Sequence, residues 1–543
     1  MAALTSWTLK SGMCPQGKGD MMKRMQGRAR MRRLAPVMAM LLALPWGAFA
    51  AEGPAGADSL SDLQSRIRAL EERLASDEAA LRAARERIEG SSRPPTQADP
   101  AMSSVAVPSN PVPAATAPAA GLPTAPDPNA LIGRFGADGF TLRSVDGANT
   151  LHLRGNISVD GRYFSDGGTP VSADTWLVRR LRPTIEGTLD GRFDFRFMPD
   201  FGLGKSVVQD AWADARINPA VVLTFGKFKA PVGLERLQLE QFARFIEPAL
   251  TADLLPYRDL GAKVGGSVAG GAVSYDLGVF DGVLDAGSTD GNSTPDANST
   301  GHFSWEGRVF TKPFLHTALA ALRGLGVGVA GTYVNNAGIA TPTATTSLLA
   351  SYKTTGQQAL LAYRGNSITG GTFNNATIAD GVEYRWVPQL YYAVGAVSVL
   401  GEYVREAQDV QRQIAAGVLR TARLSDSAWQ LQAALFLTGE REAFDSTTPR
   451  NDFGGGGIGA WELVVRLHAL RFDDAAFIDG ANSFANPATA PRGAHALGVG
   501  LNWYLNRNLK AQLDYELTRF DGGAAAGDRP DERVITSQFA LVF

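Results

Sequence analysis

Basic side chains gather in one stretch of the chain, GKFKAPVGLERLQLEQFARFIEPAL, residues 226–250. Lys227 and Lys229 stand beside aromatic residues and a proline. Arg236, Glu240 and Arg244 then recur at every fourth position, the spacing that places side chains on one face of a helix. The stretch predicts a short charged helix. It leaves open a phosphate-gripping enzyme loop, an ordinary surface helix, or a charged constriction inside a hollow protein.

Enzyme chemistry finds little support in these residue types. GKFKAP lacks the upstream glycine spacing and the Ser or Thr after lysine that a Walker loop needs. None of the five histidines lies in a G-x-S-x-G or H-E-x-x-H setting. They are His152, His302, His316, His468 and His495. The prediction is therefore no enzyme, no cofactor and no metal site, with a Ser–His pair across the fold as the one catalytic arrangement left open.

Arginines elsewhere favour contacts with oxyanions. In TWLVRRLRPTIEG, Arg180 and Arg182 share a face at period two, next to Arg179, while Leu177, Leu181 and Ile185 take the other face. Arg308 shares a face with Glu306 and Lys312 in a similar segment. Arginine is always charged and donates in a planar fork, which suits successive weak contacts with anions. The alternative is that charges of both signs, Asp210 among the acids, only solvate a wet wall.

In the segments that must position these residues, apolar and polar side chains alternate with period two. From Leu131 onward, segments of about ten residues place apolar and polar side chains in turn, and Gly, Asn, Asp or Pro separates them. Leu497 to Leu505 and Trp461 to Leu467 are two examples. The turns after Asp190, Gly271 and Asn506 are short, whereas 284–303 and 336–377 are long. This pattern predicts antiparallel strands joined by turns of uneven length.

A closed barrel explains the polar face better than a soluble sandwich. Arg–Asp alternations could not be held unpaired in a dry core, and about ten residues suffice for a tilted strand to cross a bilayer. Aromatic pairs such as Trp503–Tyr504 suit interfacial girdles. We therefore predict an all-β fold: a transmembrane antiparallel β-barrel of about 16 strands over 131–543, with its apolar face toward outer-membrane lipid and room for an aqueous channel.

Residues 1–50 read as an N-terminal extension and a secretory signal peptide. Arginines precede an apolar run, and Ala48-Phe49-Ala50 is a cleavage site. The start could be Met1, Met21, Met22 or Met25. Cleavage after Ala50 removes Cys14, the single cysteine, and so excludes disulfides and thiolate chemistry.

Two further zones precede the barrel. Residues 58–90 carry an apolar heptad seam that predicts a coiled-coil helix. Residues 91–130 form a Pro/Ala-rich linker with nothing to pack, since 91–129 hold ten prolines. A tethered coiled coil could join copies of the chain or reach a periplasmic cell-wall partner.

The charge balance argues against nucleic acid as a partner. Residues 1–50 carry eight Lys or Arg and one Asp, which leaves 44 basic and 53 acidic residues, a net charge of −9, in 51–543. A protein that binds nucleic acid through a global basic field would show the opposite balance.

Several motifs in order resemble the phosphate-selective porins of the O and P type, bacterial outer-membrane proteins. They are RRLRPTIEGTL, VVQDAWADARINP, FGKFKAPVGLERL with FIEPAL, IGAWELVVRL and GVGLNWYLNRNLKAQLDYE. The terminal strand, ending in Phe543, resembles the assembly signal of outer-membrane barrels. The resemblance spans 131–543 and implies a homotrimer of 16-stranded barrels whose third extracellular loop constricts the lumen.

The resemblance also assigns roles to residues. It implies that Arg236 occupies a basic anion-binding position, in the motif G-L-E-K of the family, here Gly233 to Arg236. It matches the paired arginines of the second strand to Arg179 and Arg180, the constriction acid to Asp210, and a further arginine to Arg308.

Two departures weaken the expectation of phosphate specificity. Asn156 and Pro248 stand where phosphate-specific members carry basic residues. The resulting hypothesis is a porin for passive diffusion of small anionic solutes such as phosphate or polyphosphate. The alternative is a structural outer-membrane protein whose coiled coil tethers a non-selective barrel to the cell wall.

Overall fold

The computed structural model describes residues 130–136, 139–165, 173–204, 206–282, 302–368 and 370–543. The predicted signal peptide, the coiled-coil helix and the linker up to residue 129 lie outside these residues. Within the described part of the chain, no helix has both the length and the apolar character needed to cross a membrane.

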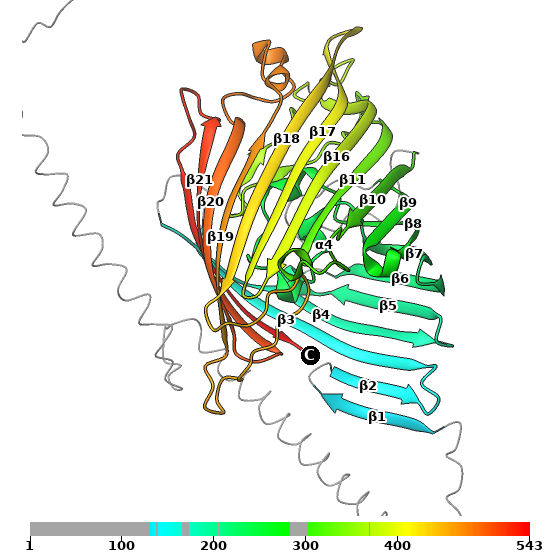
Figure 1. Ribbon diagram of the computed structural model, residues 1–543. Helices are drawn as coiled ribbons and strands as arrows, with labels where there is room; N and C mark the ends of the chain where they lie inside the picture. Colours follow the sequence, from blue (N-terminus) through cyan, green and yellow to red (C-terminus); the bar gives the residue numbers. More distant parts are fainter. Residues whose placement is uncertain (1–129, 137–138, 166–172, 205, 283–301, 369) are drawn as a thin grey trace, which may run out of the picture. The chain divides into compact units, whose positions relative to one another are not determined.

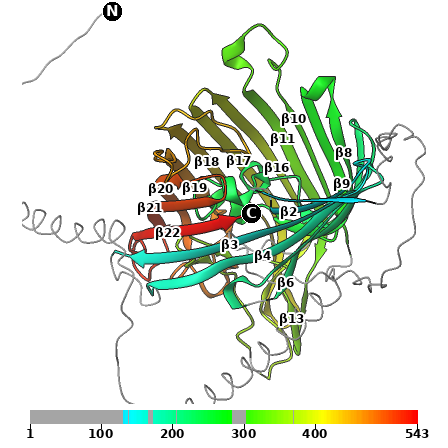
Figure 2. The same ribbon diagram turned by 90° about the horizontal axis from the view of Figure 1, so that it is seen from below.

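A ring of 16 antiparallel strands closes on itself, as predicted. Closure comes from β22 and β3, which pair from Val534↔Phe164 to Val542↔Asn156 and lie side by side in Figure 2. The strands of the ring are β3 (Thr150–Phe164), β4 (Thr175–Leu189), β5 (Phe193–Asp200), β6 (Val207–Asn218), β7 (Val221–Lys229), β8 (Arg258–Val268), β9 (Val273–Phe280), β10 (Ser304–Thr311), β11 (Leu325–Ala337), β16 (Thr377–Val394), β17 (Val397–Ala415), β18 (Val418–Phe436), β19 (Ala460–Arg471), β20 (Pro491–Tyr504), β21 (Leu509–Gly522) and β22 (Glu532–Val542).

A hairpin extends the ring next to the C-terminus. It consists of β1 (Leu131–Gly136) and β2 (Gly139–Ser144). β2 pairs with the first residues of β3, on the edge that β22 occupies further along. Phe543 and Gly155 exchange two backbone hydrogen bonds of 2.9 and 3.0 Å at the junction. The ring therefore begins at Thr150, and residues 131–144 add to its rim.

The two faces of the wall differ as a membrane barrel requires. Outward side chains such as Phe197, Leu463, Leu497 and Phe539 are large, apolar and exposed. Inward positions carry charged residues that are buried. Near one rim, the rings of Trp461 and Trp503 stack at 5.0 Å and both indoles donate to the carbonyl of Ile458. This arrangement fits lipid outside and a polar interior.

A β-bulge in β4, the strand that carries Arg179, Arg180 and Arg182, changes which of its side chains point outward. Val159 of β3 faces Val178 of β4, but Ser158 faces Arg180, so Arg179 is an extra residue. Trp176 and Val178 consequently point outward, which corrects the predicted outward position of Leu177. Arg179, Arg180 and Arg182 are all buried inside the barrel.

The connections at the two rims differ in length. We call the rim that holds the C-terminus the C-terminal rim and the other the far rim. Most turns at the C-terminal rim are tight, including 219–220 and 395–396, but the connection 437–459 between β18 and β19 is long. At the far rim most connections are long, yet β17 and β18 are joined by a two-residue turn at 416–417. The connection 312–324 between β10 and β11 is also long, so the predicted asymmetry holds with two exceptions at the C-terminal rim and one two-residue turn at the far rim.

Three connections from the far rim fill part of the interior with an apolar core. We call residues 230–257 the inner loop; it holds α4, which lies within the ring of strands (Figure 1). Its Val232, Leu254 and Leu255 pack against side chains of the 338–376 and 472–490 segments. The short elements of these connections and turns are α4 (Leu234–Leu237), β12 (Ile339–Thr341), β13 (Ala344–Thr346), β14 (Tyr352–Lys353), β15 (Ala359–Leu361), η2 (Gly202–Gly204), η3 (Glu240–Phe242), η4 (Leu250–Leu254), η5 (Ala269–Gly271), η6 (Ala320–Leu322), η7 (Asp474–Ala476) and η8 (Gly480–Asn482).

Closure of the ring can be tested at Gly155. A Cβ atom there would lie 2.5 Å from the ring of Phe543. We expect Gly155→Val to cost about 1–3 kcal/mol through overpacking and to lower the temperature at which the heat-modifiable folded band disappears on a gel. Gly365→Val is the control, because no heavy atom lies within 4 Å of a Cβ built there. Equal melting of the two variants would contradict a role for this contact.

Candidate functional site: a lumen narrowed by the inner loop

The inner loop is not the continuous helix predicted from its fourfold spacing. α4 spans only four residues, and Gln238, Leu239 and Ala243 have extended ψ angles of 145°, 131° and 132°. Arg236, Glu240 and Arg244 therefore do not share a face. The physical reason is that several backbone N–H groups of the loop donate to side chains of the wall instead of to carbonyls four residues earlier.

Three side chains of the wall and one of the 437–459 segment hold the loop backbone at four points. Glu402 accepts from the N–H of Leu234 at 2.5 Å, and Asp445 from that of Leu239 at 2.8 Å. Asp514 accepts from Ile246 N–H at 2.8 Å. Each of these carboxylates thus offers oxygen atoms to an N–H group that has no helical partner, which removes the cost of leaving that group without a hydrogen bond.

The fourth point is a histidine. His468 Nδ1 lies 3.1 Å from the backbone N of Leu250 and accepts its hydrogen bond. Nε2 lies 3.2 Å from Glu516 Oε1. Because Nδ1 is an acceptor here, the neutral ring carries its proton on Nε2. His468 therefore anchors the inner loop at Leu250.

Glu240 is the centre of a basic cluster. It accepts a short hydrogen bond from Arg182, and its carboxylate lies 3.1 Å from Arg258 and 3.6 Å from Arg180. The hydroxyl of Tyr257 donates to it at 2.5 Å. Burial opposes ionisation, but the guanidinium groups, Arg182 first, hold the pKa of Glu240 well below its usual range. The carboxylate therefore stays charged and cross-links β4, β8 and the loop.

Arg236 and Arg244 have structural partners of their own. Arg236 donates to the carbonyl of Ala252 at 2.6 Å and stacks over the ring of Tyr257 at 4.7 Å. Arg244 pairs with Glu442 at 2.6 Å and with Glu462 at 3.2 Å. The first arginine braces the loop internally. The second joins the loop to the 437–459 segment at the C-terminal rim and to β19.

The remaining predicted residues are dispersed. Lys229 donates to the carbonyl of Gln238 at 2.5 Å. Lys227, two residues before the end of β7, is buried. Arg308 donates to Gln389 at 2.9 Å and lies over the ring of Phe310. Asp210 accepts from Arg258 at 2.7 Å.

A cavity of about 330 Å³ brings part of this set together. It lies between the inner loop and the wall from β3 to β8. The charged residues that line it are Arg154, Arg196, Lys229, Arg258 and Lys263, with Glu186, Asp210, Asp214 and Glu240. Of the predicted residues, Lys229 and Asp210 line this cavity, whereas Arg236, Arg244 and Arg308 do not.

Two basic residues of this cavity, Arg258 and Lys263, carry no motif in the sequence. Their signal is positional, since β8 starts directly after the inner loop and its first residues must meet the constriction. Arg196 also lies over Trp212, at 5.8 Å from the ring centroid. The sequence places Arg196 on a charged wall but gives no reason to prefer it over its neighbours.

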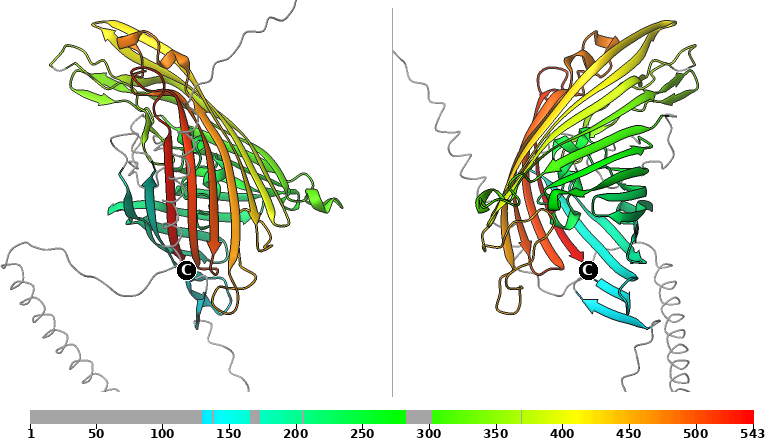
Figure 3. Two further views of the ribbon diagram at one scale, coloured as in Figure 1. Left: turned by 90° about the vertical axis from the view of Figure 1, so that its left-hand side faces the viewer. Right: turned by 45° about the vertical axis from the view of Figure 1, so that its right-hand side comes forward.

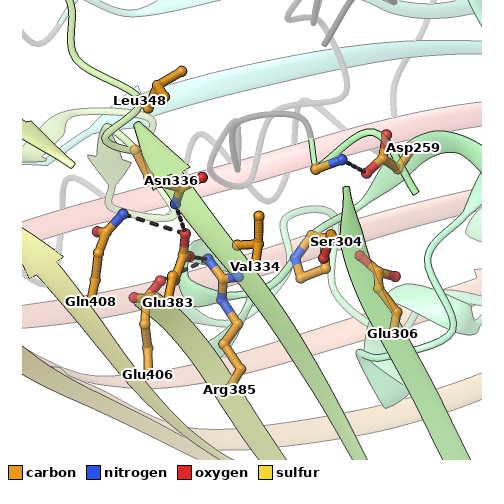
Figure 4. Close-up of a pocket in the computed structure, with 13 residues that line it drawn as sticks. Asp259, Ser304, Glu306, Val334, Asn336, Leu348, Glu383, Arg385, Glu406 and Gln408 are labelled. Carbon is orange, nitrogen blue, oxygen red and sulfur yellow. Dashed lines mark hydrogen bonds and ion pairs between the residues drawn. The ribbon is translucent and has the colours of Figure 1, made fainter. Parts of the chain in front are cut away.

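A smaller hollow of about 30 Å³ has the opposite character. Figure 4 shows its carboxylates, Asp259, Glu306, Glu383 and Glu406, with one arginine among them, Arg385. Arg385 pairs with Glu406 at 2.7 Å and also with Glu383. The described lumen is therefore divided, with an acidic hollow beside β10, β16 and β17 and the larger cavity with more basic than acidic residues beside β3–β8.

The comparison with protein families decides the identity. The profile described as phosphate-selective porin O and P matches residues 150–543. The chain belongs to this family. It is an outer-membrane porin, a β-barrel that forms a channel. The comparison with curated proteins found no match to this porin.

Solved structures that align with this porin include other outer-membrane barrels. One is the channel DcaP of Acinetobacter baumannii, with a TM-score of 0.44 and 9% identity over 74% of this chain and 99% of that one. Another is OprB of Pseudomonas putida, with a TM-score of 0.43 and 11% identity over 74% and 95%. A third is the trimer form of OmpT of Vibrio cholerae, with a TM-score of 0.44 and 10% identity over 73% and 100%.

The Arg244–Glu442 contact yields a pH prediction. Burial, opposed by Arg244, raises the pKa of Glu442 to about 7. An unfolded Glu has a pKa of about 4.3, so the folded porin binds the extra proton between these values and loses stability as pH rises through that window. Glu442→Gln removes this loss.

We expect Glu442→Gln to raise the thermal unfolding midpoint at pH 8 by about 1–3 °C and to leave it unchanged at pH 3, where the carboxyl group is protonated in both states. Circular dichroism in detergent measures both midpoints. Asp452→Asn, at an exposed carboxylate of the same segment, is the control for loss of charge. A lower midpoint for Glu442→Gln at pH 8 would show instead that the charged pair stabilises the fold.

Proposed function

We propose that this porin passes small anions by passive diffusion, with phosphate or polyphosphate as the first solutes to test. The observation that carries the proposal is the sharing of acids among guanidinium groups along the cavity. Glu186 forms ion pairs with Arg154 and Arg196, and Asp210 forms ion pairs with Arg258 and Arg196. One carboxylate therefore compensates parts of two cations.

The same sharing continues at the constriction. Glu240 faces Arg180, Arg182 and Arg258 together, and Asp200 takes a further contact from Arg182 at 2.7 Å. These four carboxylates are divided among five guanidinium groups. Lys229, Lys263 and Asp214 line the same cavity, and Lys263 pairs with Asp276 at 2.6 Å. A local excess of positive charge favours anions in a narrow, partly desolvated passage.

The mechanism follows from the properties of these groups. Each arginine is already paired with a carboxylate, so a passing anion is held less strongly than it would be by an uncompensated guanidinium group. Such contacts replace part of the hydration shell and remain weak enough for exit, which conduction requires. Asn156 lines the cavity where phosphate-specific members carry a basic residue, which favours general anion selectivity over tight phosphate binding.

Assembly belongs to the same proposal. We assign the C-terminal rim to the periplasm and propose a homotrimer, supported by the family and by the heptad seam at 58–90. Chemical cross-linking in intact outer membranes tests it, with deletion of residues 52–129 separating the barrel's own contribution from that of the predicted coiled coil.

Ion selectivity in planar bilayers tests the anion path. Under a KCl gradient we expect a reversal potential that shows preference for Cl⁻ over K⁺. A unit charge about 7 Å from the ion path is worth about 0.6 kcal/mol in water, so Lys229→Gln and Arg196→Gln should each lower the permeability ratio about threefold.

Arg423→Gln is the matched control, because Arg423 is half-exposed and pairs with Asp409 on the outward face of β17–β18. A preference for K⁺ in the unmodified porin would refute the anion path and leave the porin assignment intact.

A further inference from the structure

Three arginines come together at the far rim, on a different wall from the constriction. Arg412 of β17 stands directly opposite Arg420 of β18 in the strand register. On its other side Arg412 faces Thr377, whose N–H donates to the carbonyl of Arg364 at 2.8 Å. Figure 3 shows β17 and β18 in yellow beside the orange 472–490 segment at this rim.

Two of the arginines hold the 472–490 segment. Arg364 donates to Ser483 Oγ at 3.1 Å and to the carbonyl of Gly480 at 3.2 Å. Arg420 donates to the carbonyl of Asn482 at 2.9 Å and pairs with Asp479 at 3.0 Å. Of these four acceptors, three are neutral, and the fourth, the Asp479 carboxylate, belongs to a side chain that is 58% exposed.

The third arginine has no such acceptor. Arg412 is 4% exposed, and its Nε and Nη1 atoms have no hydrogen-bond partner among the described residues. Val410 and Leu424, the next buried apolar residues along the inner faces of β17 and β18, belong to the apolar core. That layer separates Arg412 from the carboxylates deeper in the barrel.

This arrangement is unusual because a buried, uncompensated charge is costly. Native proteins pair such a group or let it bind an ion. Had Arg412 served only to brace the 472–490 segment, its guanidinium would donate to that segment's carbonyls as those of Arg364 and Arg420 do.

We propose that Arg412, flanked by Arg364 and Arg420, forms an oxyanion-binding site that fastens the 472–490 segment to β17 and β18. Planar guanidinium forks suit phosphate-like groups. Arg412 lies on the inner face of β17, so the ligand is a dissolved oxyanion and not a lipid headgroup. The site is separate from the proposed anion path and does not depend on its selectivity.

Hydrogen exchange of the full-length porin in detergent, with and without inorganic pyrophosphate, tests the site. At a pyrophosphate concentration ten times Kd, opening that requires release of the anion becomes about tenfold rarer. We therefore expect amide exchange in residues 472–490 to slow about tenfold in the unmodified porin. Arg412→Gln should abolish this slowing, and Arg412→Lys should retain part of it.

Two controls keep the outcome clear. Arg423→Gln, on the outward face of the same hairpin, should behave like the unmodified porin. The pair Lys229→Gln and Arg196→Gln should keep the protection of 472–490 even if it loses selectivity in bilayers, which separates this site from the channel proposal. Absence of protection in the unmodified porin, or equal protection in a folded Arg412→Gln variant, would overturn the site.

Discussion

The inner loop must satisfy its backbone hydrogen bonds inside a barrel, and the rest of the lumen is built around that constraint. A loop within a lumen cannot rely on bulk water for each N–H group, and a four-residue helix satisfies few of them. Carboxylates of the wall and one neutral histidine take over this task. The charges on β17, β19 and β21 are therefore structural before they are functional.

This constraint divides the wall. Where the loop is anchored, acids such as Glu402 and Asp514 accept hydrogen bonds from the loop and are buried beneath it. On the opposite side, the residues of β3–β8 that line the cavity include five basic side chains and three acids. Anchoring the loop thus removes negative charge from the passage, and the basic residues face the solute. The packing of the inner loop and the basic character of the cavity therefore have the same structural cause.

The sequence predicts the parts of this structure that depend on period and length. Alternation with period two places the strands, their number and the polarity of each face, because these depend on burial alone. Register is different: the bulge at Arg179 adds one residue to β4 and shifts Trp176 outward, and alternation cannot show it. The short helix predicted within 226–250 fails for a related reason, since the competing acceptors come from strands more than 150 residues away.

The net charge of −9 predicted for residues 51–543 does not oppose an anion path. Exposed charges separated by more than about 8 Å are largely screened at physiological ionic strength. Acids on the loops and outer rims therefore contribute little to the potential inside the lumen. What a solute senses is the local balance within the cavity, where Glu240 and Asp210 each serve more than one guanidinium group. Selectivity in such a channel is set by how acids are shared along the wall and not by how many the chain contains.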